Sequence, residues 1–86
     1  MPELCRFLGI SIYMYFNDHD PPHFHVKYNE YRASLSISDL NVIDGLLPHR
    51  VLMLVIEWAF EHRNELMKNW LSIKENGSFQ KIKPLE

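Results

Sequence analysis

The chain has 86 residues, enough for one domain with one small core, because a chain of this size buries only about 60–65% of its unfolded surface. Hydrophobic residues make up 47% and charged residues 23%, a globular balance that argues against disorder. The net charge of -2 offers no general attraction for nucleic acid, and the single cysteine excludes an internal disulfide and a cysteine-based zinc site.

Alternating apolar and polar side chains predict an antiparallel sheet within residues 7–43. Residues 7–16 form the first expected strand and residues 23–28 the second. A two-residue turn, Asn29-Glu30, leads into a third strand that ends near Ile37. A short extended piece at residues 41–43 could add an edge strand before Asp44-Gly45 turns the chain, so we expect three or four strands.

The second half of the chain has the spacing of a helix. Apolar residues recur at steps of three and four, which predicts one long amphipathic helix over about 48–75, ended by Asn76-Gly77. The alternative is a break near Arg63-Asn64, where Asn64 could cap a second helix. The C-terminal tail, residues 78–86, would lie along the sheet or the helix.

These elements predict a single α+β domain over residues 1–86, a two-layer sandwich of a small antiparallel sheet on one long helix. No apolar segment reaches the roughly 18 residues that a membrane span needs, and the first residues lack a leader pattern. We therefore expect a cytoplasmic protein without a membrane partner.

The segment 18–26 organises the chain, because it gathers two carboxylates and three of the five histidines around a double proline. Proline fixes its own φ and favours extended geometry in the residue before it, so we expect a stiff turn that enters a strand. In that strand His23, His25 and Lys27 lie on one side. If the strands form a meander, the face left open by the helix also collects Tyr13, Tyr15, Arg32, Ser34 and Ser36.

Several motifs carry a family resemblance over nearly the whole chain. They are Arg6-Phe7-x-Gly9-Ile10, Met14-Tyr15-Phe16-Asn17-Asp18-His19, Pro21-Pro22-His23-Phe24-His25-Val26, Glu57-Trp58-Ala59 with His62-Arg63 and Asn69-Trp70, and the tail Lys81-Ile82-x-Pro84-Leu85-Glu86. With these motifs the chain resembles the small bacterial family catalogued as domain of unknown function 4160. The resemblance implies a neighbouring gene for a second small protein, in an arrangement like a toxin-antitoxin pair. The resemblance does not identify catalytic residues, because none can be carried over from a family of unknown function.

The interpretation we favour is a toxin-like component of such a two-gene module, which binds a small cognate protein or a target through the open face and needs no cofactor. Tyr and Arg are common at the centres of interfaces. In this interpretation the histidines are contact or structural groups, and the binding residues include Tyr15, Asp18, His19 and Asp20.

A first alternative is a metal-independent ribonuclease that uses the same face. Cleavage beside a 2′-hydroxyl needs a base, an acid and a cation for the charge that develops on phosphorus. His23 or His25 would be the base, and the other histidine or Tyr13 the acid. The stabilising cation would be Arg32, Lys27 or Arg6.

A second alternative is a metal site. His23-x-His25 places two imidazoles about 6.5 Å apart along one side of a strand, close enough to share an ion. The third ligand would come from Asp20, or from Asp18 or His19. Zinc is the favoured ion because it accepts both nitrogen and oxygen ligands.

Overall fold

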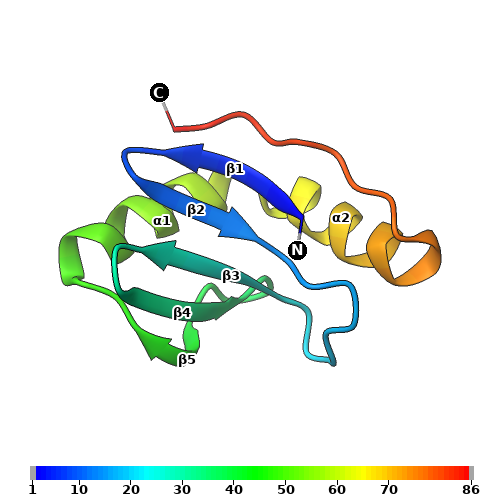
Figure 1. Ribbon diagram of the computed structural model, residues 1–86, viewed down its shortest axis with the longest axis horizontal. Coiled ribbons are helices and arrows are strands. Elements are labelled where there is room, and N and C mark those ends of the chain that lie inside the picture. Colours follow the sequence, from blue (N-terminus) through cyan, green and yellow to red (C-terminus); the bar gives the residue numbers. More distant parts are fainter. Residues whose placement is uncertain (1, 86) are drawn as a thin grey trace.

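The computed structural model describes residues 2–85, and within them it has five strands and two helices (Figure 1). Each strand pairs antiparallel with the next, so the sheet is a meander in the order β1-β2-β3-β4-β5. Both helices lie on one side of this sheet, which confirms the α+β class. The elements are β1 (Glu3–Phe7), β2 (Ile10–Tyr13), β3 (His23–Tyr28), β4 (Tyr31–Ser36), β5 (Val42–Leu46), α1 (His49–Glu61) and α2 (Arg63–Asn76).

The strand expected over residues 7–16 is wrong in its bounds, because the chain reverses at Leu8-Gly9 and forms a hairpin of β1 and β2. Phe7 pairs with Ile10, and the two turn residues both have positive φ, 51° and 78°. This geometry matches the two-residue hairpin turns that fit the twist of a sheet. A leucine at positive φ gives no turn signal in the sequence, so the hairpin was missed. The Asn29-Glu30 turn is confirmed, since Tyr28 pairs with Tyr31.

Asp44-Gly45 does not turn the chain but lies inside β5, which gives the sheet its fifth strand. Gly45 has φ 83° and pairs with Ala33 of β4. A Cβ atom at this position would collide with the carbonyl oxygen of Arg32 and would stand 2.8 Å from the Cα of Ala33. The edge strand therefore needs glycine both for its backbone angle and for its close approach to β4.

The helical half contains two helices rather than one, and the break falls at His62, with φ -119° and ψ 21°. The N–H of His62 donates to the Ala59 carbonyl, and its ring lies 5.3 Å from the ring of Trp58. Its Nδ1 also pairs with Glu65 Oε1 at 2.6 Å in the first turn of α2. The alternative of a broken helix is thus confirmed one residue before the place expected. Asn64 as the cap of the second helix is wrong, because α2 already begins at Arg63 and His62 is its N-cap residue. The stop at Asn76-Gly77 is confirmed as well, with Gly77 at φ 77°.

The core lies between the sheet and the two helices. Phe24 and Val26 of β3 are fully buried in it, beside Trp58 of α1. The Trp58 ring lies 6.4 Å from that of Phe24 and 5.8 Å from that of Phe7. Alternate residues of β3 therefore point away from this core, as the pattern of the sequence predicts.

Within residues 2–85, no helix is both long and apolar enough to cross a bilayer.

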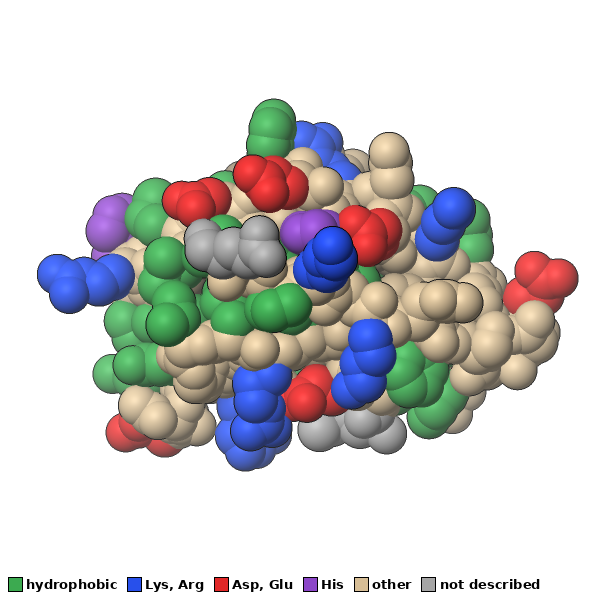
Figure 2. Space-filling model, turned by 90° about the horizontal axis from the view of Figure 1, so that it is seen from above, with side chains coloured by type: hydrophobic (Ala, Val, Ile, Leu, Met, Phe, Trp, Pro, Cys, Tyr) green, Lys and Arg blue, Asp and Glu red, His purple; other side chains and the backbone are tan. Residues whose placement is uncertain are grey.

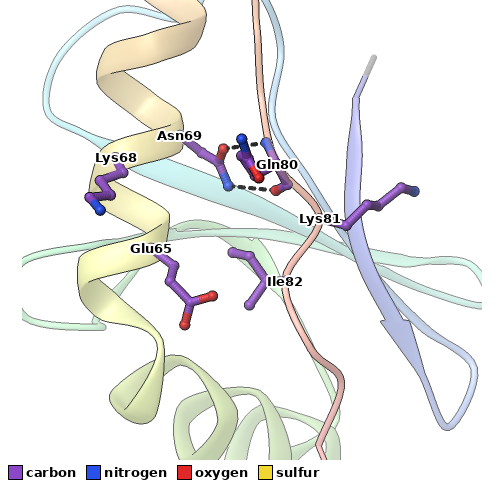
Figure 3. A pocket seen from close by; sticks show the side chains of 6 residues that line it. All are labelled: Glu65, Lys68, Asn69, Gln80, Lys81 and Ile82. Atoms are coloured by element: carbon purple, nitrogen blue, oxygen red, sulfur yellow. Dashed lines mark hydrogen bonds between the residues drawn. The ribbon is translucent and has the colours of Figure 1, made fainter.

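The C-terminal tail runs beside β1 and is held by backbone and side-chain hydrogen bonds (Figure 1). Ile82 N–H donates to the Leu4 carbonyl at 2.9 Å, and Trp58 Nε1–H donates to the Lys83 carbonyl at 2.7 Å. The buried Asn69 of α2 makes two bonds with the backbone of Gln80, at 2.9 and 2.8 Å (Figure 3). The tail thereby covers the outer edge of β1, and charged side chains of both signs are scattered over this side (Figure 2).

We predict that Gly45→Ala lowers the free energy of unfolding by about 2 kcal/mol or more, because it adds both backbone strain and a collision with β4. The matched control is Gly77→Ala, which has nearly the same φ but no atom within 4 Å of the new Cβ. That control should lose only about 1 kcal/mol. Equal losses for the two variants, measured by urea unfolding, would show that the approach of β5 to β4 does not matter.

Candidate metal centre

The connection between β2 and β3, residues 14–22, folds back over the sheet face that the core does not use. Tyr15 N–H donates to Asp18 Oδ2 at 3.3 Å, and Ile37 N–H donates to the Pro22 carbonyl at 3.1 Å. The Asp20–Pro21 peptide bond is cis. This path brings the Asp18 carboxylate over the side chains of β3.

Asp18, His23 and His25 form a compact cluster. Asp18 Oδ2 lies 2.9 Å from His25 Nε2 and 3.5 Å from His23 Nε2. One nitrogen or oxygen atom of each residue lies within 4.8 Å of those of the other two. The three side chains are only 16%, 11% and 15% exposed, so the cluster is shielded but not sealed.

The other ring nitrogen of each histidine also has a partner. His23 Nδ1 is 2.7 Å from the carbonyl oxygen of Pro21, and His25 Nδ1 is 3.0 Å from Ser34 Oγ. Ser34 stands directly opposite His25 in the pairing of β3 and β4. Ser34 is buried, and its hydrogen bond to Nδ1 positions the imidazole of His25.

Aromatic rings enclose the two imidazoles. Tyr13 stacks on His25 with ring centroids 5.3 Å apart, and Tyr15 meets the same ring edge-on at 4.4 Å. Trp70, from α2, lies 5.2 Å from His23. Burial, with a smaller effect of the Tyr15 hydroxyl, raises the pKa of Tyr13, so this phenol keeps its proton at neutral pH.

The expectation of a fully open sheet face is therefore corrected. Tyr13, His23, Ser34 and Ser36 are buried. Asp18 and Tyr15 of the 14–22 connection contact the residues of this face, and α2 reaches His23 through Trp70. The two histidines do share one side of β3, with ring centroids 5.0 Å apart.

The remaining candidates of the sequence lie outside the cluster. Asp20 points to solvent and comes within 4.0 Å of Lys74, so the structure brings Asp18 and not Asp20 to the histidines. His19 is exposed. Arg6 pairs with Glu3 at 2.8 Å on β1, away from the imidazoles.

Lys27 and Arg32 lie on the same face as His25, and both are exposed. They form the cross-strand pair two residues along from the pair of His25 and Ser34. Arg32 lines a shallow hollow of about 250 Å³. The other side chains around this hollow come from β2, β4, β5, the 14–22 connection and His25 itself; they are Tyr13, Tyr15, Ala33, Ser34 and Asp44.

Ser34, Pro21 and Trp70 are the residues of the site to which the sequence interpretation gave no role. For Ser34 a signal was present: the two-residue turn at Asn29-Glu30 fixes the register, and that register puts residue 34 opposite residue 25. The Pro21 carbonyl and the Trp70 ring depend on tertiary packing, so no local pattern reveals them.

Fold and cluster define a small α+β protein with a histidine-carboxylate centre on its sheet. The family model of the domain of unknown function DUF4160 matches residues 9–71, and the chain belongs to this family. The matched range contains every residue of the cluster. Searches of the curated proteins and of the solved structures found no match.

Proposed function

We propose that this protein is a metal-binding domain in which Asp18, His23 and His25 hold one divalent transition-metal ion, with zinc as the first candidate. The observation that supports it best is that both Nδ1 atoms have hydrogen-bond partners while both Nε2 atoms converge on Asp18 Oδ2.

The position of the hydrogen on His23 follows from its partner. A carbonyl oxygen only accepts, so His23 Nδ1 carries the hydrogen that it donates to Pro21. In the neutral ring Nε2 then has a lone pair, and this lone pair faces Asp18 Oδ2 across 3.5 Å. Two acceptors that face each other repel, and a cation between them turns the repulsion into attraction.

His25 Nε2 lies 2.9 Å from Asp18 Oδ2, and because a carboxylate only accepts, Nε2–H donates this hydrogen bond. His25 presents a lone pair at Nε2 once its hydrogen is on Nδ1 instead, as binding of a metal ion through Nε2 requires. The Ser34 hydroxyl can accept a hydrogen bond from Nδ1–H as readily as it can donate one. A histidine that binds a metal ion usually donates its other N–H to a carbonyl, carboxylate or similar acceptor, which fixes the ring. Both rings of this cluster have such a partner in place.

The distances suit a small ion. Zinc binds nitrogen and oxygen at about 2.0–2.2 Å, which separates tetrahedral ligand atoms by about 3.3–3.6 Å. The 3.5 Å between Asp18 and His23 already fits, and the 2.9 Å between Asp18 and His25 has to widen by about half an ångström. Three protein ligands leave a position for water or a bound group, as in catalytic zinc sites.

We predict that protein purified without a histidine tag contains about one zinc ion per chain, measured by mass spectrometry of the metal content. His23→Gln, His25→Gln and Asp18→Asn remove ligands at nearly constant shape and should each lose most of the metal. The controls His19→Gln and Asp20→Asn change the same residue types next to the cluster and should retain it.

Zinc should also stabilise the fold, by about 2.7 kcal/mol at a free concentration one hundred times Kd. That gain corresponds to a rise in Tm on the order of 10 °C for a chain of this size. Metal content at background level, or equal losses in the control variants, would contradict the proposal.

A second candidate function is the partner-binding role of a toxin-like component in a two-gene module. The observation that favours it is the edge strand β5, which exposes Val42, Ile43 and Leu46 by 39%, 47% and 69%. The tail covers the opposite edge at β1, whereas an exposed apolar edge can pair with a strand of another protein. The small protein of the neighbouring gene is the proposed partner.

We predict that this protein and the product of its neighbouring gene elute together in size-exclusion chromatography after coexpression. The double variant Ile43→Lys/Leu46→Lys should abolish the complex, because it places two charges on the proposed edge. Leu71→Lys/Phe79→Lys changes two exposed apolar residues elsewhere and should leave it intact. A complex that survives the β5 substitutions would rule out this edge.

A further inference from the structure

Two positive charges face each other directly on the sheet. Lys27 of β3 pairs in register with Arg32 of β4, and both side chains are exposed. Like charges in directly opposite positions of an antiparallel pair destabilise it. The pairing of Lys27 with Arg32 therefore lowers the stability of the sheet.

No carboxylate of residues 2–85 lies within ion-pair distance of either cation. Of the nine lysines and arginines, Arg6 and Lys74 alone have such a partner among residues 2–85. Lys27 and Arg32 differ from the other cations without a carboxylate partner in that they face each other directly, which concentrates positive charge on the sheet although the whole chain has a net charge of -2.

The two cations stand beside the candidate metal centre. Lys27 is two residues beyond His25 on the same side of β3, a step of about 6.6 Å. Arg32 and His25 line the same hollow of about 250 Å³. Of the cluster, His25 lines this hollow, and Lys27 lines a separate hollow of similar size. A ligand in the first hollow can contact both the Arg32 guanidinium and His25.

The chemistry of the hollow selects among anions. A guanidinium binds phosphate oxygens through paired hydrogen bonds. Asp44 also lines the hollow, and its carboxylate repels a doubly charged phosphate more than a singly charged phosphodiester. Tyr15 lines it too, and this residue is 38% exposed, which allows a base to stack on its ring.

We infer that Lys27 and Arg32 form a subsite for a phosphodiester group of a nucleotide chain, whose neighbouring atoms reach the ion held by Asp18, His23 and His25. The contact with the ion rests on the proposed metal-binding function. The contact with the two cations does not, so the two parts can fail separately.

The test is fluorescence anisotropy with a labelled single-stranded oligoribonucleotide of about ten nucleotides, with and without zinc. Lys27→Ala/Arg32→Ala should weaken binding at least tenfold and make it less dependent on salt, since two phosphate contacts are lost. The matched control, Arg50→Ala/Lys68→Ala, removes the same charge from the exposed helical side and should change binding less than twofold. Tyr15→Leu should weaken binding about tenfold.

Zinc should tighten binding of the oligoribonucleotide to the wild type. Equal weakening by the sheet pair and by the helical control would show unspecific attraction by charge and would overturn the inference. If zinc binds stoichiometrically but the sheet pair has no effect, the inference fails and the metal proposal stands. If zinc does not bind, the metal proposal and the contact with the ion fail, while a selective effect of the sheet pair still supports the subsite.

Two further comparisons complete the test. The first uses an oligodeoxyribonucleotide of the same sequence, and inorganic phosphate as competitor, to distinguish RNA, DNA and free phosphate as the source of the anion. Preferential binding of inorganic phosphate would overturn the assignment to a phosphodiester.

The second uses Lys27→Glu, which places opposite charges across the strands, so it should raise Tm while it weakens binding. A drop in Tm would contradict the view that the cation pair costs stability.

Discussion

The hydrogen bond from His23 Nδ1–H to the Pro21 carbonyl is the constraint on which this account of the site depends. It is short, 2.7 Å, and its acceptor cannot donate, so it determines which nitrogen of His23 is left for other partners. That nitrogen faces the Asp18 carboxylate, as does Nε2 of His25. The carbonyl of Pro21, two residues before His23, thus determines which ring nitrogen of His23 can bind a metal ion.

The fold positions this bond in two ways. Pairing of β3 with both β2 and β4 holds the histidines on one side of the sheet and places Ser34 opposite His25. The return of the 14–22 connection is anchored to the sheet by the bond between Ile37 N–H and the Pro22 carbonyl. Trp70 then packs against His23, so α2 supports the site as well as the core.

The parity of the strands was enough to predict that His23 and His25 share a side. The three- and four-residue steps were enough to predict a helical second half, but not its division into two helices at His62. Local pattern failed where an unexpected residue adopts positive φ, as Leu8 does, or where a turn-like pair lies within a strand, as Asp44-Gly45 does. It also failed to distinguish Asp18 from Asp20, because that choice depends on how the connection folds back. The burial of the sheet face around His23 and His25 was missed for the same reason, because it too depends on the path of the 14–22 connection.

The most direct test of the account is ¹⁵N NMR of the imidazole rings in zinc-loaded protein. We predict that His23 and His25 both carry their hydrogen on Nδ1 and that both Nε2 atoms shift on zinc binding, while His19 does not change. Zinc bound through Nδ1, or rings that do not respond to zinc at all, would contradict the assignment of Asp18, His23 and His25 as a metal centre.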